Sequence, residues 1–139
     1  MSNKKFKVPM AVTTLRTIAV IWTLAAIVDA ILLVIGKGQT RDFKDWPILA
    51  LWGVAIIGLV VAWKWNLVGG IIAITFTALH DILAWIVNGS WQPGYMVMWA
   101  FIIPPAILFI IAWVLERNAR QKYEAELKKS RSYYSIRGK

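Results

Sequence analysis

The chain alternates long apolar segments with short polar ones over its first 115 residues. Four apolar segments are recognisable, at about residues 17–35, 47–63, 67–87 and 95–115. A helix of about 20 apolar residues crosses the hydrocarbon core of a bilayer. The pattern therefore predicts an all-α protein, in which residues 1–115 form a bundle of four transmembrane helices and residues 116–139 form a basic cytoplasmic helical extension.

Turn residues separate the predicted helices. Pro47 suits the first turn of the second helix, where its missing N–H is not needed. Lys64 lies in a tight turn before the third helix, and Gly89 ends that helix within a turn-forming segment. Tryptophans bracket the short second helix and are expected at the membrane interface: Trp46, Trp63 and Trp65. Because Glu116 and Arg120 have i,i+4 spacing, we expect the fourth helix to continue for a few turns before a disordered end.

The composition excludes an ordinary small soluble domain. Of the 139 residues, 59% are hydrophobic and the mean hydropathy is +0.60, whereas about half of a globular domain is apolar. The absence of cysteine excludes disulfides, thiolate metal sites and cysteine nucleophiles. Phosphate-binding, zinc-protease and serine-hydrolase motifs are also missing from the sequence. We therefore predict a protein that is not an enzyme and that holds neither a cofactor nor a metal.

Positive charges are distributed unevenly over the two sides of the predicted bundle. The segment up to residue 16, the turn at residue 64 and the tail carry four, one and eight of the 16 Lys and Arg, and the first loop carries the other three. Since cytoplasmic segments are enriched in these residues, both termini are predicted to be cytoplasmic. Topology thus explains the net charge of +9, and no nucleic-acid partner is expected. Four cations are placed to meet the headgroups of membrane lipids: Arg16, Lys64, Arg117 and Arg120.

Two acidic residues stand inside apolar segments. Asp29 and Asp81 each lie about seven residues, or roughly 10 Å, from the same side of the predicted membrane. A carboxylate in hydrocarbon is costly, so it indicates a functional or assembly role. The single histidine, His80, adjoins Asp81, although successive side chains on a helix point about 100° apart. If the first and third helices are neighbours, the two carboxylates can meet.

Further polar groups are expected at this depth. Thr77 lies one turn before Asp81 and could bond a neutral carboxyl group. Pro104 and Pro105 cannot donate to the carbonyls four residues before them in the fourth helix. These freed carbonyls, together with two carboxylates, would be oxygen ligands for a cation, or the prolines simply produce a kink.

Two functions are compatible with these residues. In the first, which we predict, the Asp29, His80 and Asp81 side chains form a polar network within a non-catalytic small subunit of a membrane complex or a homo-oligomer. In the second, the same residues handle protons or cations in a small transporter or channel. An intramembrane enzyme would lack a nucleophile near the aspartates. Close helix packing, within a chain or between subunits, is favoured by a stripe of small and polar residues on the third helix: Gly70, Ala73, Thr77, Asp81, Ala84 and Asn88.

The segment from Ala62 to Ile72 combines a tryptophan-rich turn with Gly69-Gly70 at the start of the third helix. The stretch Pro104–Trp113 supplies a proline-containing fourth helix. In these features the chain resembles small uncharacterised prokaryotic membrane proteins of four helices. The resemblance implies the four-helix fold and a bacterial or archaeal source, and the expected location is therefore a prokaryotic cytoplasmic membrane. It implies no activity, and the His80-Asp81 pair lies outside it.

Overall fold

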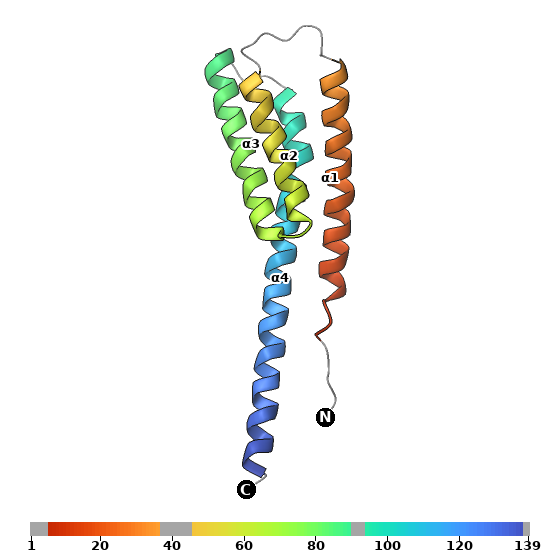
Figure 1. Cartoon of the computed structure of the whole chain (residues 1–139), viewed down its shortest axis with the longest axis vertical. Helices are drawn as coiled ribbons and strands as arrows, with labels where there is room; N and C mark the ends of the chain where they lie inside the picture. The colour runs from red at the N-terminus through yellow and green to blue at the C-terminus, as the bar shows by residue number, and fades with distance from the viewer. Residues whose placement is uncertain (1–5, 37–45, 90–93, 138–139) are drawn as a thin grey trace.

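The computed structural model describes residues 6–36, 46–89 and 94–137. Its helices are α1 (Met10–Gly36), α2 (Trp46–Ala62), α3 (Asn66–Asn88) and α4 (Gly94–Arg137), as Figure 1 shows. No strand occurs in the described residues. The predicted all-α helical bundle is therefore confirmed.

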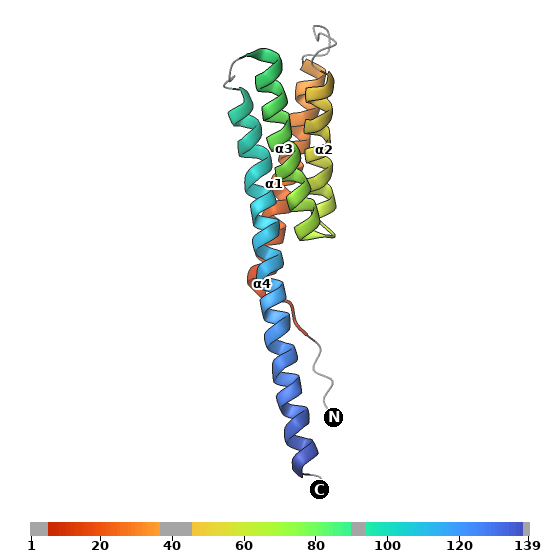
Figure 2. The ribbon, with the colours of Figure 1, turned by 90° about the vertical axis from the view of Figure 1, so that its left-hand side faces the viewer.

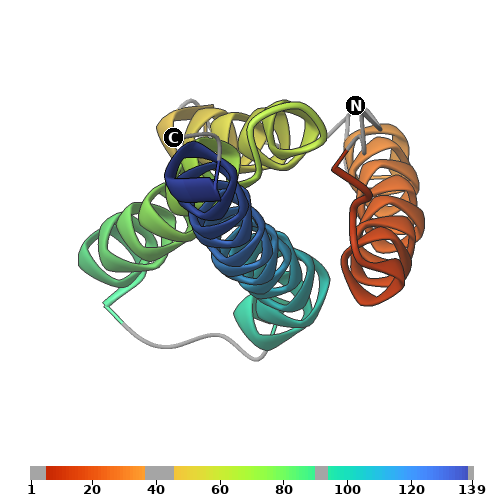
Figure 3. The same ribbon diagram turned by 90° about the horizontal axis from the view of Figure 1, so that it is seen from below.

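Successive helices run in opposite directions, and α4 projects well beyond the other three (Figures 1 and 2). We call the end toward which both termini point the tail end, and the end where α1 finishes and α2 starts the loop end. α2 packs most extensively against α3, α3 also packs against α4, and α1 packs chiefly against α4. Viewed along the bundle axis, α1 lies to one side of the other helices (Figure 3). The helices that carry Asp29 and Asp81 are therefore not packed against each other over their length.

Three helices are long and apolar enough to cross a membrane. The qualifying stretches are Met10–Leu32 of α1, Asn66–Asn88 of α3 and Trp99–Ser130 of α4. α2 is also apolar, but its 17 residues give about 25 Å of helix, somewhat less than a hydrocarbon core of roughly 30 Å. These lengths favour a membrane protein, and a complete span by α2 stays a prediction.

α1 begins earlier than the hydrophobic pattern predicted. Its first residue is Met10 rather than a residue near position 17. The first turn follows Pro9, whose carbonyl accepts the N–H of Val12 at 3.0 Å. The hydroxyls of Thr14 and Thr17 donate to carbonyls one turn earlier, at 3.1 and 3.0 Å, so these polar side chains are satisfied within the helix. Local hydrogen bonding therefore compensates for the polar residues that made this segment look like a preceding loop.

α4 is one unbroken helix of 44 residues, and it continues to Arg137 instead of ending a few turns past the apolar segment. Glu116 accepts a hydrogen bond from Arg120 at 3.2 Å, as the i,i+4 spacing predicted. The segment before α1 also supports the extension, because the Phe6 and Tyr123 rings lie 5.6 Å apart. Packing from outside α4 could not be inferred from the polar sequence of the tail.

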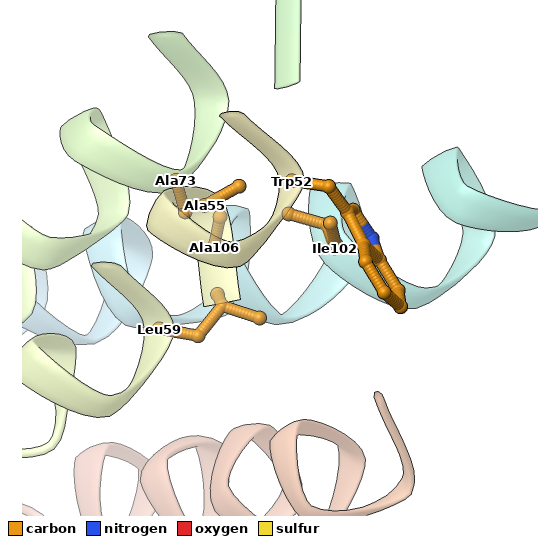
Figure 4. Close-up of a cluster of buried hydrophobic side chains, with 6 residues drawn as sticks. All are labelled: Trp52, Ala55, Leu59, Ala73, Ile102 and Ala106. Atoms are coloured by element: carbon orange, nitrogen blue, oxygen red, sulfur yellow. The ribbon is translucent and has the colours of Figure 1, made fainter. Parts of the chain in front are cut away.

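Small side chains make up much of the core. One cluster joins α2, α3 and α4, and Figure 4 shows its members: Trp52, Ala55, Leu59, Ala73, Ile102 and Ala106. A second cluster brings α1 into the bundle through Ala19, which lies with Ala62 and Phe109. The predicted small-residue stripe of α3 is buried from Gly70 to Ala84. Alanine and glycine let helix backbones approach closely, and this contact is a main source of helix association in lipid.

The closest approach between helices occurs where α2 and α3 meet near the tail end. A Cβ atom added at Gly58 would lie 2.8 Å from the backbone nitrogen of Ala73. A Cβ atom added at Gly69 would collide with the backbone of both Ala62 and Gly58. Two glycines on facing helices thus remove the side chains that would otherwise separate the backbones. The neighbouring Gly70 faces α4, where an added Cβ atom would lie 3.0 Å from the carbonyl oxygen of Ala106.

We predict that Gly69→Ala destabilises the folded bundle because the added methyl group has no space between two backbones. The expected loss in the free energy of unfolding is about 1–3 kcal/mol, the usual range for over-packing. Reversible unfolding of the protein in mixed micelles or bicelles, followed by circular dichroism, measures this change.

Gly53→Ala is the matched control for this prediction. The same methyl group would meet nothing within 4 Å at Gly53, which also lies inside a helix. Removing a glycine from a helix interior stabilises it by up to about 1 kcal/mol. Equal effects of the two substitutions would show that the α2–α3 contact is not sterically limited.

Candidate functional site

The most enclosed polar group lies between α3 and α4 toward the loop end. Asp81 and His80 on α3 are 8% and 2% exposed. The Nδ1 atom of His80 lies 3.0 Å from Oδ1 of Asp81, so a proton on Nδ1 is donated to the carboxylate. The other oxygen, Oδ2, accepts a hydrogen bond from the indole N–H of Trp99 on α4. We call these three residues the Asp81 group.

The structure changes the predicted relation of Asp81 to its neighbours on α3. Adjacent side chains on a helix start out about 100° apart, yet His80 reaches the carboxylate directly. The hydroxyl of Thr77 instead donates to the carbonyl of Ala73 at 2.8 Å, within its own helix. A hydroxyl has one proton to donate, so in this arrangement Thr77 is not a donor to Asp81.

Asp29 is separate from the Asp81 group. It lies half-buried on α1, a helix that packs chiefly against α4. Asp81 has His80 and Trp99 as hydrogen-bond partners, and neither of these belongs to α1. Within the described part of the chain, no hydrogen bond or ion pair joins the two carboxylates. Similar depth along the helices therefore did not bring the two acidic residues together, because the order in which the helices pack keeps α1 away from α3.

A groove opens beside the Asp81 carboxylate. Its volume is about 250 Å³, and its described lining is Ala78, Asp81, Ile82, Trp85 and Trp99. Helical spacing alone places three of these residues together, since positions 78, 81 and 85 lie on one face of α3. Trp99 comes from α4 and closes the other side. The sequence could not supply this tryptophan, because the register of α4 against α3 is set by packing.

The proline pair in α4 is accommodated without ending the helix. Pro104 cannot donate to the carbonyl of Ala100, as the sequence predicted. The indole N–H of Trp22 on α1 donates to this carbonyl at 3.2 Å. A side chain on a neighbouring helix thus replaces the missing amide, as neighbours commonly do in membrane helices. The freed carbonyl of Ala100 contributes to the α1–α4 contact rather than to a site shared by the two carboxylates.

A second polar group lies at the tail end. Arg16 on α1 places Nη2 2.6 Å from Oε2 of Glu116 on α4, and Arg120 contacts the other oxygen of the same carboxylate at 3.2 Å. With its amide oriented to satisfy both neighbours, Asn66 accepts from Arg16 Nη2 and Nε at 2.6 and 2.9 Å and donates to the Ala62 carbonyl at 2.8 Å. Asn66 is 3% exposed. The group therefore links the start of α3 to α1 and α4.

Sequence reasoning assigned Arg16 to lipid headgroups and left Asn66 without a role. An asparagine at the junction of a tight turn and an apolar helix was the available signal, since a buried amide requires partners. About one third of the Arg16 side chain remains exposed, which leaves room for a lipid headgroup. The headgroup contact of Arg16 stays a prediction. The other three predicted headgroup residues lie over aromatic rings: Lys64 is 5.4 Å from the Trp65 ring, Arg117 is 5.2 Å from the Trp113 ring and Arg120 is 5.5 Å from the Phe6 ring.

The arrangement restricts the available chemistry. Among the residues that the structure describes, no three His, Cys, Asp or Glu side chains are grouped as metal ligands. The Asp81 group combines a carboxylate with an imidazole, which together can hold or exchange a proton. The tail-end group is a bridged ion pair with a buried amide. The fold and these two groups define a class: a small helical bundle with three membrane-length helices and a polar group near each end.

Comparison with known proteins agrees with this class at the level of the family. A family model described as a domain of unknown function (DUF7670) matches residues 8–122, and the chain belongs to this uncharacterised family. The matched range includes both the Asp81 group and the Glu116–Arg120 pair. No curated protein and no solved structure matches the chain.

We predict that Trp22 and Pro104 are energetically coupled. In the native chain, Trp22→Phe removes the donor to the Ala100 carbonyl and should cost about 1 kcal/mol, within the range for hydrogen bonds between membrane helices. In a Pro104→Ala background the restored amide donates to the same carbonyl, so the same substitution should cost clearly less. A double-mutant cycle of unfolding free energies measures the coupling.

Trp63→Phe provides the comparison for loss of indole volume, since Trp63 is 42% exposed and lies outside the α1–α4 contact. Strict additivity of Trp22→Phe and Pro104→Ala would contradict the proposed replacement of the amide by the indole.

Proposed function

We propose that this protein is a non-catalytic integral membrane protein that works as a subunit of a membrane assembly, either with copies of itself or with other membrane subunits. The observation that carries the proposal is the contrast between its two intramembrane carboxylates. Asp81 receives hydrogen bonds from two side chains of its own chain. Asp29 is half-buried on α1 and forms no hydrogen bond or ion pair with a described residue. A polar side chain in hydrocarbon is expected to find a partner, and for Asp29 the partner would be another chain.

The surface of α1 supports the same proposal. Large apolar side chains remain exposed along much of the helix, and Ile21, Val28 and Leu32 are between 55% and 62% exposed. Lipid could cover this surface by itself. A helix that carries an acidic residue among such side chains is better suited to contact with a second helix, where the carboxylate can accept a hydrogen bond.

The proposed location is a prokaryotic cytoplasmic membrane, with both termini in the cytoplasm. Thirteen of the 16 Lys and Arg fall on the side of the termini in the predicted topology, as expected for the cytoplasmic side. In the structure, Arg16, Lys64 and Arg117 belong to the tail end of the bundle, toward which both termini point (Figure 1). Cytoplasmic termini also fit the extension of α4, a long polar helix unsuited to hydrocarbon.

We predict that the native protein purifies from its own membranes as a stoichiometric assembly and that Asp29→Ala reduces the mass of this assembly. The reason is that the substitution removes the one carboxylate on α1, which would accept a hydrogen bond from a neighbouring chain. Native mass spectrometry of protein extracted directly in lipid nanodiscs measures the mass and any subunits that co-purify.

Thr17→Ala is the control on the same helix, because the Thr17 hydroxyl donates to the carbonyl of Thr13 and needs no partner from outside. A monomeric native protein without co-purifying chains would contradict the assembly proposal. An assembly equally tolerant of both substitutions would contradict the role of Asp29.

A second candidate function, a proton- or cation-coupled small transporter or channel, is favoured by the Asp81 group. A carboxylate and an imidazole lie in contact beside a groove that reaches Asp81. These are the side chains that carry protons in membrane transporters. The structure supports this candidate for Asp81 and His80 more than for Asp29, which lies on another helix.

For this second candidate, we expect purified protein in liposomes to conduct protons or cations and Asp81→Asn to abolish the flux, because an amide can neither release a proton nor supply a negative charge. A pH-sensitive dye inside the liposomes reports the rate. Asp29→Asn, measured in the same assay, shows whether the flux also depends on the other carboxylate. Flux that persists in Asp81→Asn would rule out a coupled mechanism centred on the Asp81 group.

A further inference from the structure

The groove beside Asp81 has the chemistry of a binding site for a lipophilic organic cation. We propose that it binds a small ammonium ion with apolar substituents, held by the Asp81 carboxylate and by the rings of Trp85 and Trp99. The proposal concerns binding and depends neither on assembly through Asp29 nor on transport.

The charge of Asp81 favours a cation as its partner. One oxygen of Asp81 contacts Nδ1 of His80 and the other accepts a hydrogen bond from the indole N–H of Trp99, which carries no charge. Within the described residues, no Lys or Arg side chain forms an ion pair with Asp81. Each carboxylate oxygen can accept a second interaction. A cation in the groove would supply the opposite charge that a buried carboxylate requires.

The walls of the groove also favour a cation. Trp85 and Trp99 are 56% and 42% exposed and line the same groove as Asp81. Indole rings attract cations through their negative faces, and cages of aromatic side chains are a recognised way to bind quaternary ammonium groups. The chain uses this interaction elsewhere, since Lys64, Arg117 and Arg120 each lie over an aromatic ring at 5.2 to 5.5 Å.

The lining and the depth of the groove favour an organic cation over a metal ion. Calcium and magnesium require six or more oxygen ligands, whereas the described lining supplies one carboxylate among apolar and aromatic side chains. The groove also lies well before the end of α3, since Asp81 is seven residues, or about 10 Å, from Asn88 at the end of the helix. A strongly hydrated ion would have to lose its water there. A large ammonium ion with alkyl groups is weakly hydrated and fits the apolar surroundings.

The small side chain of Ala78 leaves space in the groove. Ala78 lies one turn before Asp81 on the same face of α3, and its methyl group leaves room above the carboxylate. The volume of about 250 Å³ suits a compact cation rather than a large drug-like molecule. A larger residue at position 78 would fill the groove while leaving every residue of the Asp81 group in the sequence.

Tetrapropylammonium is the probe for this proposal. The full chain is placed in nanodiscs of phosphatidylglycerol, which has no ammonium group, and titrated by calorimetry with empty nanodiscs as the blank. We expect one site per chain. Asp81→Asn should weaken binding at least tenfold, and Trp85→Leu should weaken it about 2- to 30-fold, the range that corresponds to a cation–π interaction. Ala78→Phe should abolish binding while circular dichroism shows the native helix content.

Two substitutions away from the groove provide matched controls. Trp63→Leu removes an exposed tryptophan at the tail end, and Glu124→Gln removes an exposed carboxylate on the extension of α4. Both should bind as the native chain does. A native chain that does not bind the probe would overturn the proposal, and so would a folded Asp81→Asn variant with unchanged affinity.

A parallel titration in phosphatidylcholine nanodiscs identifies the source of the cation. A loss of tetrapropylammonium binding there beyond that expected from the missing surface charge of phosphatidylglycerol would support the site and show that a lipid ammonium headgroup competes for it. Equal binding in both lipids, once this surface charge is allowed for, would support a site for soluble organic cations. These results do not depend on oligomeric state, so failure of the assembly proposal and failure of the binding proposal can be told apart.

Discussion

The backbone contact between α2 and α3 is the constraint on which the rest of the bundle depends. Gly58 and Gly69 leave no room for a side chain between the two helices. Contact at this distance fixes the rotation of α3 about its axis, and with it the direction of every residue on the α3 stripe. Gly70 then faces α4, and Asp81, three turns further along, faces the indole of Trp99. The polar chemistry of the loop end follows from glycine packing near the tail end.

Two polar groups connect the bundle where small-residue packing does not. Near the loop end, Trp99 joins α4 to α3 through the Asp81 carboxylate. At the tail end, Arg16 joins α1 to Glu116 of α4 and to Asn66 of α3. Between them, Trp22 occupies the carbonyl that the proline pair leaves free. α1 has little contact with α2 and α3, so its contact with α4, through these hydrogen bonds and the apolar cluster of Ala19 and Phe109, is most of what holds it in the bundle.

Helix number, helix type and the close-packed face of α3 could be predicted because they follow from local patterns: apolar length, turn residues and spacing of three or four. The freed carbonyl at Ala100 was also predictable, since it follows from the covalent structure of Pro104. The partners of Asp81, Arg16 and Asn66 were not, because they depend on which helices become neighbours. Asp29 and Asp81 lie at similar depths in similar helices, and depth alone does not determine lateral position.

The continuity of α4 has a mechanical consequence. A helix of 44 residues is about 66 Å long, roughly twice the thickness of the hydrocarbon core. Trp99 near one end and the basic extension at the other therefore belong to one rod. If α4 tilted by roughly 10° about the middle of the rod, its far end would move by about 6 Å on this geometry. Trp99, about 25 Å from the middle, would move by about 4 Å in the opposite direction, so a change in how Trp99 sits against Asp81 would be transmitted to the end of the extension.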